Sequence, residues 1–418
     1  MSTVIRVSGK GQMQFVGKRQ AGEWAEDLGT RVAMIQALIP LGLAAVRDVL
    51  QQDVERLAGA RYAREGGRPG HVRWSKERGS VYLGDQKLPI VYQRVRDQLR
   101  DVEVPLETYQ RFQEPRALDE GLMRRVLLGL SCRRYAECAE AVPEAFGLAP
   151  STVSRRYIRA SARQLQALLE RRLEGYDLVA LLVDGKTFAE DEMVVVLGVT
   201  MQGHKVILGF VQTGTENTRV IAELLRDLVV RGLRYEQGLL VVIDGSKGLR
   251  RGVQEVFGDG AVVQRCTWHK RENVVDYLPK AQQAAWRQKL QRAYEQPTYD
   301  EAKITLDRLA RELRVLNESA ARSLAEGLEE TLTLHRLGIA GELGRSFKTT
   351  NMLESVMAQV EARTGKVDRW RTSDQKQRWL ASALLDIEPR LRRIRGYRAL
   401  PKLRAALQRV LGKEVPAA

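Results

Sequence analysis

The stretches DLVALLVDGK, residues 177–186, and GLLVVIDGSKGL, residues 238–249, decide the fold of this chain. Each is a run of Val, Leu and Ile that stops at an Asp-Gly pair, which is typical of a short buried strand followed by a turn. Asp184 and Asp244 therefore each stand at the end of a predicted strand. A rigid sheet would present both carboxylates at an open edge, where a ligand can reach them.

The elements around these two runs predict a mixed α/β sheet. Strand, strand, strand, helix, strand, helix, strand is the order of an RNase H-like fold, in which the first and fourth strands are neighbours. The order thus predicts that Asp184 and Asp244 lie side by side. The predicted strands are residues 177–185, 192–200 and 205–212, the run that ends in Asp244, and GAVVQRC at 260–266; the helices are ENTRVIAELLRDLVVRGL at 216–233 and one that follows Ser246.

A third acidic residue, Glu354, lies in KTTNMLESV, residues 348–356, where the pattern indicates the first turn of a helix. Three such acids suit a divalent metal, because Mg²⁺ takes hard oxygen ligands and is usually held by one or two carboxylates plus substrate phosphate. Two ions, Mg²⁺ or Mn²⁺, roughly 3.5 to 4 Å apart can serve an in-line phosphoryl displacement. The alternative is structural. Asn351-x-x-Glu354 also fits a capping box, in which the glutamate only accepts a backbone N–H at the helix start.

Four motifs in this order resemble the bacterial Mutator-type insertion-sequence DDE transposases. They are VDGK around Asp184, VIDGSKGL around Asp244, RCTWHKRENV at 265–274, and TTNMLES around Glu354. An Asp-Gly pair alone is weak evidence, because turns use it constantly, but four motifs in order are specific. The resemblance covers roughly residues 115–395. It implies that Asp184, Asp244 and Glu354 are a DDE triad, with a helical insertion between the second Asp and the Glu.

Four side chains near the triad are candidates for supporting roles. By resemblance, Cys266-x-x-His269 is a family motif close to the active site; the alternative is a packed cysteine and a satisfied histidine. Structural zinc is disfavoured, because it needs four ligands and no second Cys or His pair has ligand spacing. Lys186 and Lys247, just past the two aspartates, are candidates to hold phosphates. Trp268 is assigned to the core rather than to a base-stacking platform.

Composition favours a polyanionic partner. The chain carries 68 Lys and Arg against 52 Asp and Glu, a formal net charge of +16, and each phosphate that a basic side chain neutralises releases counterions. The longest apolar stretch, residues 32–46, is shorter than the ~20 residues of a membrane helix. It also lies too far from Met1 for a signal peptide, and three cysteines give no disulfide framework. We expect a cytoplasmic, nucleoid-associated bacterial protein that contacts no membrane.

Three modules are predicted ahead of the first aspartate. Residues 1–60 are an N-terminal helical region, in which residues 23–58 are predicted to form two helices broken near Pro40. A helical cap is the favoured interpretation, and a dimerisation element is the alternative. Residues 61–115 are a basic DNA-binding module with β-like runs separated by turns (HVRW, SVYLG, LPIVYQRV); a solvated charged face is the alternative. Residues 116–173 resemble a helix-turn-helix, whose second helix reads the major groove; an ordinary helical hairpin is the alternative. That second helix is expected to bury Val153 and Ile158 and to expose Ser151, Thr152, Ser154, Arg155, Arg156 and Arg159.

Four segments complete the predicted organisation. Residues 174–271 and 346–388 are the two parts of the RNase H-like core, and residues 272–345 are an all-helical insertion. Residues 389–418 form a basic tail. It carries eight Arg and Lys and no acid between Arg390 and Arg409, so we expect it to lie along phosphate.

These patterns together predict a DNA transposase. Metal held between the three acids would activate water to hydrolyse the phosphodiester at the end of a mobile element, and the freed 3′-OH would attack target DNA in the same pocket. The expected partner is double-stranded DNA, as terminal inverted repeats and as target, bound by at least a dimer. Two alternatives stay open, an RNase H-like nuclease or junction resolvase and a non-catalytic DNA-binding regulator. A tyrosine recombinase is disfavoured, because Tyr397 lacks a His-rich catalytic cluster upstream.

Overall fold

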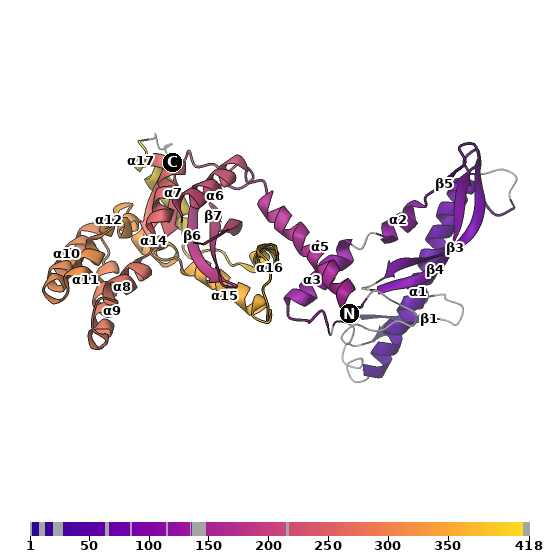
Figure 1. The fold of residues 1–418 in the computed structure, drawn as a ribbon, viewed down its shortest axis with the longest axis horizontal. Helices are drawn as coiled ribbons and strands as arrows, with labels where there is room; N and C mark the ends of the chain where they lie inside the picture. The colour runs from indigo at the N-terminus through magenta and orange to yellow at the C-terminus, as the bar shows by residue number, and fades with distance from the viewer. Residues whose placement is uncertain are drawn as a thin grey trace. The chain divides into compact units, whose positions relative to one another are not determined.

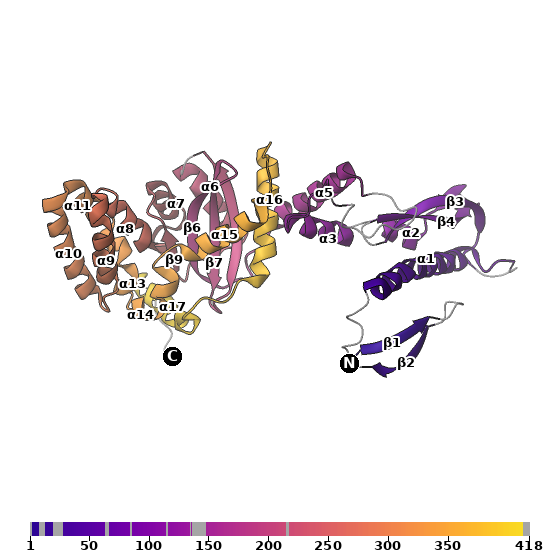
Figure 2. The ribbon, with the colours of Figure 1, turned by 90° about the horizontal axis from the view of Figure 1, so that it is seen from below.

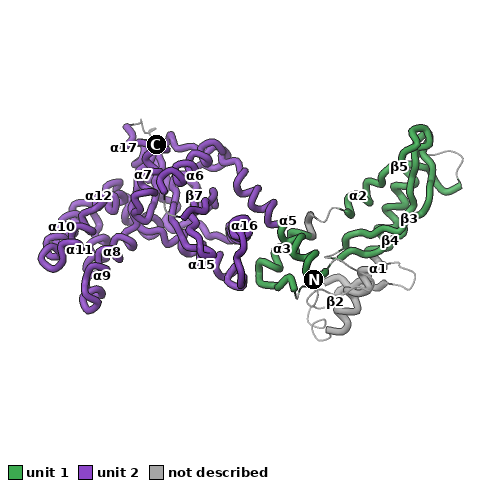
Figure 3. Tube along the Cα trace, in the orientation of Figure 1, with its two compact units in different colours: residues 1–160 green, residues 161–418 purple. Residues whose placement is uncertain are grey.

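A computed structural model describes residues 2–7, 13–19, 28–62, 67–83, 86–113, 116–133, 135, 148–214 and 217–412. The chain divides into two compact units, residues 1–160 and 161–418 (Figure 3). Within the described ranges, no helix is long and apolar enough to cross a membrane.

The first unit packs a long helix on an antiparallel sheet (Figure 1). The helix side chains Val46, Leu50 and Val54 recur at helical spacing, so they form one face, and they share a core with Val81 and Ile90 of the sheet. The elements are β1 (Ser2–Val7), β2 (Met13–Arg19), α1 (Leu28–Ala58), β3 (His71–Leu83), β4 (Gln86–Asp97), β5 (Val102–Val104), α2 (Glu107–Gln113) and α3 (Arg116–Leu127). β1 pairs with β2, and β3, β4 and β5 form a three-stranded sheet.

Residues 2–7 and 13–19 of the region expected to be helical form the strands β1 and β2. Two further expectations for the first unit are wrong. α1 continues through Pro40 as one helix. An interior proline costs a helix ~3 kcal/mol through a lost hydrogen bond and a clash, and the packing of α1 from Val46 onwards offsets a cost of that size. The runs HVRW and SVYLG belong to a single strand, β3, whose register shifts between Arg73 and Lys76. An irregularity of this kind disrupts the ladder locally without ending the strand.

A mixed five-stranded sheet forms the centre of the second unit, in the order β10-β9-β6-β7-β8. β6 runs antiparallel to β7 and parallel to β9, and β10 is parallel to β9. The five predicted strands are confirmed, and the first and fourth are neighbours as expected. This topology is consistent with an RNase H-like core. The strands are β6 (Leu178–Phe188), β7 (Asp191–Thr200), β8 (Lys205–Thr213), β9 (Leu239–Ile243) and β10 (Ala261–Arg265).

Strand alternation assigns each side chain of this sheet to a face. Leu181 and Val183 of β6, with Val241 and Ile243 of β9, belong to the core that α6 (Thr218–Val230) and α7 (Lys247–Phe257) complete. Successive strand side chains point to opposite faces. The residue after Val183, which is still inside β6, therefore faces away from α6 and α7.

All residues from 267 to 347 are described and none lies in a strand, in agreement with the helical pattern. These helices share a core that includes Trp286, Leu306 and Leu324. The buried ammonium of Lys270 donates to the carbonyl oxygen of Ser323 at 2.6 Å and so ties α8 to α11. The helices are α8 (Thr267–Val275), α9 (Lys280–Tyr294), α10 (Tyr299–Leu316), α11 (Glu318–Ala325), α12 (Leu328–Thr331), α13 (Thr333–Arg336) and α14 (Ala340–Phe347).

Two further helices, α15 (Asn351–Thr364) and α16 (Ser373–Ile387), lie beside the sheet, where α15 contacts β6 and α16 contacts β8 (Figure 2). Within the expected basic tail, residues 400–410 form a helix, α17 (Leu400–Val410). Leu400, Leu403 and Leu407 share one face of α17 and are buried. Arg404 donates to the carboxylate of Asp177 and to a carbonyl oxygen of β6. An apolar face at helical spacing made this part of the chain a folded element.

Candidate active site

The two aspartates are brought together by the pairing of β6 with β9. Val183 lies opposite Ile243 in the parallel register. The expectation that a strand ends at Asp184 is wrong, because β6 continues to Phe188 and pairs with β7 beyond this residue. Asp184 points away from α6 and α7, and Asp244, the first residue after β9, lies near enough for its charge to act on Asp184. Parallel neighbours of this kind place two carboxylates beside each other.

The Asp-Gly pair at the end of β9 has a structural cause. Gly245 has φ +112°, and a Cβ there would overlap the guanidinium of Arg265, so only glycine fits. The backbone N–H of Ser246 donates to Oδ1 of Asp244 at 2.8 Å, as in turns closed by an aspartate side chain. The turn therefore holds the Asp244 carboxylate at the edge of the sheet.

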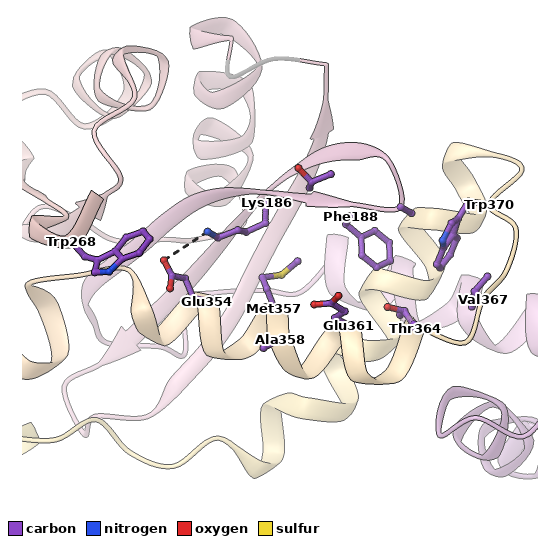
Figure 4. Close-up of a pocket in the computed structure, with 13 residues that line it drawn as sticks. Lys186, Phe188, Trp268, Glu354, Met357, Ala358, Glu361, Thr364, Val367 and Trp370 are labelled. Carbon is purple, nitrogen blue, oxygen red and sulfur yellow. Dashed lines mark ion pairs between the residues drawn. The ribbon is translucent and has the colours of Figure 1, made fainter. Parts of the chain in front are cut away.

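Glu354 faces the same site from α15 and does not cap the helix. The N-cap residue is Thr350, which makes no side-chain capping bond, and Asn351 is already helical. Oε1 of Glu354 lies 3.8 Å from Nζ of Lys186 and 3.7 Å from Nε2 of His269. Figure 4 marks the ion pair with Lys186. The capping-box interpretation is therefore wrong.

One ammonium bridges two of the three acids. Nζ of Lys186 lies 3.7 Å from Oδ2 of Asp184 as well as 3.8 Å from Oε1 of Glu354. Both carboxylate oxygens are buried, and neither has a hydrogen-bond partner among the described residues. Asp184 itself is 1% exposed. Buried carboxylates without full pairing are costly, so this arrangement favours the binding of further positive charge.

The electrostatics agree with that interpretation. Burial raises the pKa of Asp184 from 3.8 to about 7; Lys186 opposes the shift, and the charges of Asp244 and Glu354 reinforce it. Burial also lowers the pKa of His269 below its usual 6.5, so its imidazole is neutral at pH 7 and above. A carboxyl group half protonated at neutral pH is one that a divalent cation would deprotonate on binding.

The candidate site has the type of ligand atoms that a hard divalent cation prefers, but these atoms are not closely spaced. Over the described part of the chain, no three His, Cys, Asp or Glu side chains are gathered closely enough to hold a metal ion. Asp184, Asp244 and Glu354 nevertheless provide oxygen donors of the type that Mg²⁺ prefers. The unpartnered oxygens of Asp184 and Glu354 face a single cation, Lys186. Replacement of that ammonium by a metal ion would satisfy both.

Cys266 connects the strand that leads to Asp244 with the helix that carries Glu354. Its backbone N–H donates to the carbonyl oxygen of Ile243 at 2.7 Å, and its buried sulfur accepts from the hydroxyl of Thr350 at 3.8 Å. Burial raises the pKa of the Cys266 thiol, which keeps it neutral. His269 lies against Glu354, and Cys266 contacts Thr350 at the start of α15, so both residues of the Cys-x-x-His motif contact this part of the chain. The spacing of the motif alone did not predict these contacts.

Two residues predicted near the site are placed differently. Lys247 is exposed in the first turn of α7, and the described contacts include none between it and the three acids. Trp268 is 40% exposed, so its assignment to the core is wrong. The buried face of α8 is set by Thr267, Lys270 and Val274 at helical spacing, which turns Trp268 outwards.

The expected DNA-reading helix is α5 (Pro150–Leu169), which begins in the first unit. The expected helix before it falls mostly on residues 136–147, outside the described residues. Ser151, Arg155 and Arg159 are exposed and Thr152 and Ser154 are half-buried.

Two of the burial expectations for α5 are wrong. Arg156 is 3% exposed, and Ile158 is 45% exposed. Residues five apart on a helix, such as Val153 and Ile158, point roughly 140° apart at 3.6 residues per turn. Val153, Arg156 and Ala160 share the buried face instead, and Nε of Arg156 donates to Asp119 of α3 at 2.7 Å.

A basic groove of about 800 Å³ lies in the first unit between α1 and β3 and β4. Arg61, Arg73 and Lys76 line it, as does Arg47 of α1, which the sequence did not single out. Tyr62 is 88% exposed, with the guanidinium of Arg61 5.0 Å from its ring centre. Cations and exposed aromatic rings in one groove suit a nucleic-acid strand.

Comparison with known proteins gives one family. A family model described as "Transposase, Mutator family" matches residues 44–388. The transposase for insertion sequence element IST2 of Acidithiobacillus ferrooxidans is 30% identical over 230 residues, 53% of this chain and 75% of that protein. The transposase for element IS6120 of Mycolicibacterium smegmatis is 28% identical over 254 residues, 59% of this chain and 77% of that protein. That for element IS1081 of Mycobacterium tuberculosis is 26% identical over 309 residues, 70% of this chain and 71% of that protein.

Proposed function

Because the chain belongs to the Mutator family of transposases, we propose that Asp184, Asp244 and Glu354 are the acids that cut the ends of a mobile element and join them to target DNA. One observation carries the proposal. Carboxylates from β6 and α15, far apart in sequence, meet at one ammonium, and Asp244 lies on the neighbouring strand beside them.

Each side chain of the site has a role in this proposal. Two Mg²⁺ or Mn²⁺ ions bound by the three acids would supply activation of the attacking oxygen and charge neutralisation at the leaving oxygen. Lys186, released from the carboxylates, would turn its ammonium to a non-bridging phosphate oxygen. Neutral His269 would hold the Glu354 carboxylate in orientation. Cys266 and Thr350 would keep the start of α15 against the end of β9.

The rest of the chain would select the DNA. We assign the RNase H-like core to residues 174–271 and 346–388, interrupted by the helical insertion 272–345. Arg155 and Arg159 on α5 would contact the terminal inverted repeat, and the basic groove beside Tyr62 would hold its phosphate backbone. The net charge of +16 supports a polyanionic partner. Two ends held for joining would require a dimer or a larger assembly.

The test is a joining assay with purified full-length protein and DNA that carries the element's own ends, in Mg²⁺ or Mn²⁺. Asp244→Asn removes one acid, and Asp259→Asn, an exposed acid outside the site, is the matched control. We expect strand transfer by the wild type and by Asp259→Asn, and none by Asp244→Asn. Nicking without joining would favour a nuclease. Binding without cleavage would favour a non-catalytic regulator.

A further inference from the structure

A groove of about 460 Å³ continues from the candidate active site along α15 (Figure 4). Lys186, Trp268 and Glu354 line the end nearest the acids, and Phe188 and Trp370 line the far end. The floor between them is Met357, Ala358, Glu361 and Thr364 of α15. The groove therefore combines the site's cation with an apolar, aromatic wall.

The exposure of Trp268 is the observation in this groove that points to a ligand. It keeps 40% of its surface exposed beside the acids of the candidate site, although α8 buries Thr267, Lys270 and Val274 on another face. Its ring meets only the edge of His269 among the ring contacts of the described residues, with centroids 4.8 Å apart at 77°. At the far end, Trp370 is already engaged, with ring centroids 5.2 Å from Phe188 and 6.0 Å from Trp379. Trp268 is thus the aromatic side chain available to a ligand.

Size and charge restrict that ligand. A groove of this volume matches the pocket of one drug-sized molecule, which is the scale of one or two nucleotides and far below that of a duplex. From Glu354 to Thr364 the α15 wall rises ~15 Å, compared with 3.4 Å per nucleotide of a stacked strand. Lys186 offers a cation at the end nearest the acids, whereas the Glu361 carboxylate can accept hydrogen bonds from base edges.

We propose that this groove binds unpaired nucleotides of the DNA strand next to the phosphate being attacked, with one base stacked on Trp268. This inference rests on the proposed function, because it takes the three acids as the place of that phosphate. An enzyme that acts inside a duplex can unstack a nucleotide and hold it against an aromatic side chain, and such stacking tolerates any base. The strand comes either from the element end or from the target.

Fluorescence of 2-aminopurine tests the binding step directly. The base is placed at each position flanking the cut in the element end, and in a second series at the insertion point of the target. With wild-type protein we expect one position to be quenched, and with Trp268→Ala the same position to brighten, because the base is unstacked without a quencher. The series that responds identifies the source of the strand. Equal signals with both proteins at every position would overturn the proposal.

Cleavage of paired and mismatched ends tests the consequence. On fully paired ends, Trp268→Ala should cleave about ten- to a hundredfold more slowly, the loss that one stacked base implies, and Trp268→Phe should stay close to wild type. A mismatch at the responsive position should restore most of the lost rate. Tyr277→Ala, an exposed aromatic outside the groove, should not change the rate. Equal rates for Trp268→Ala and wild type on paired ends would reject the groove.

The two proposals fail in different ways. If wild-type protein neither cleaves nor joins, the proposed function is wrong, whatever the fluorescence. If cleavage proceeds and depends on Asp244 but is unchanged by the substitution of Trp268, only the assignment of the groove is wrong. Thermal unfolding of each variant separates a loss of stacking from a loss of fold, and Trp268→Phe keeps an aromatic ring if the alanine variant is unstable.

Discussion

Asp119 in the first unit and Asp184 in the second are both almost fully buried, yet their surroundings are opposite. Asp119 is 0% exposed and accepts from Nε of Arg156 at 2.7 Å and from Nη2 of Arg159 at 2.7 Å. Asp184 is 1% exposed, and its Oδ2 has no hydrogen-bond partner among the described residues. The nearest cation, Lys186, is 3.7 Å away.

The difference separates an acid that holds two helices together from one that, in the proposed function, binds a metal ion. Two arginines satisfy the carboxylate of Asp119 and fix α5 against α3. Asp184 keeps an unsatisfied oxygen at the end of a sheet, where the packing of Val183 and Ile243 holds it in place. Perturbed and unsatisfied groups of this kind concentrate at functional sites. Burial alone does not distinguish the two acids, but their hydrogen bonds do.

The largest expected effect is on cleavage by Asp184→Asn. An amide cannot supply the charge that a divalent ion needs, so we expect cleavage to fall about 10³-fold or more with binding to element ends unchanged. Gel-shift and cleavage assays on the same protein measure both. Asp259→Asn is the control. If Asp184→Asn cut DNA at a rate near wild type, the contrast with Asp119 would lose its functional meaning.

Asp119→Asn should instead damage the fold. Removal of one partner from a buried ion pair typically costs 3–5 kcal/mol, because Arg156 is left buried without its counter-charge. We expect a lower urea midpoint for the first unit and weaker DNA binding, since α5 loses its anchor. Arg159→Gln should cost less, because the Arg159 side chain is 53% exposed. Equal stability of wild type and Asp119→Asn would remove the structural role of this acid.

The pH dependence of stability should distinguish the two acids next. Burial raises the pKa of Asp184 to about 7 in the folded protein, above its usual 3.8. Between these values the folded protein binds more protons than the unfolded chain, so stability falls as pH rises. Without metal, Asp184→Asn should therefore be about 1–3 kcal/mol more stable than wild type at pH 8 and similar at pH 4. Thermal unfolding across pH in a chelator checks this, and a constant difference would contradict it.

Cys266→Ala should have the smallest effect. It removes the sulfur that accepts from Thr350 and leaves a small cavity, at a cost of about 1 kcal/mol. If the contact positions Glu354, the cleavage rate should fall several-fold while Asp244-dependent metal binding stays. Cys132→Ala, at a half-buried cysteine outside the site, should change neither. A drop in stability with no change in rate would make Cys266 a packing residue only.

Much of the catalytic unit could be predicted from local pattern. Val- and Leu-rich runs predicted five strands, two of them with an Asp-Gly pair, and the strand order predicted that Asp184 and Asp244 are neighbours, because this topology leaves few alternatives. The faces of α5 and α8 were less predictable. Arg156 is buried because Asp119, 37 positions earlier, neutralises it, and Trp268 is exposed because the buried Lys270 takes the inner face of α8. Asp119 and Ser323, whose carbonyl oxygen accepts from the buried Lys270 ammonium, both lie far away in the sequence.

The sequence by itself determined which residue types are present, where the buried strands lie along the chain, and that the chain is a basic protein with the motifs of one family. Only the tertiary structure decided that Lys186 stands between Asp184 and Glu354, that Cys266 holds Thr350, and that Trp268 opens a groove beside them. The physical reason is the distance along the chain over which the deciding interactions act. Strand and helix patterns arise from neighbours along the chain, whereas the charge and burial of a side chain depend on groups that packing brings from distant segments.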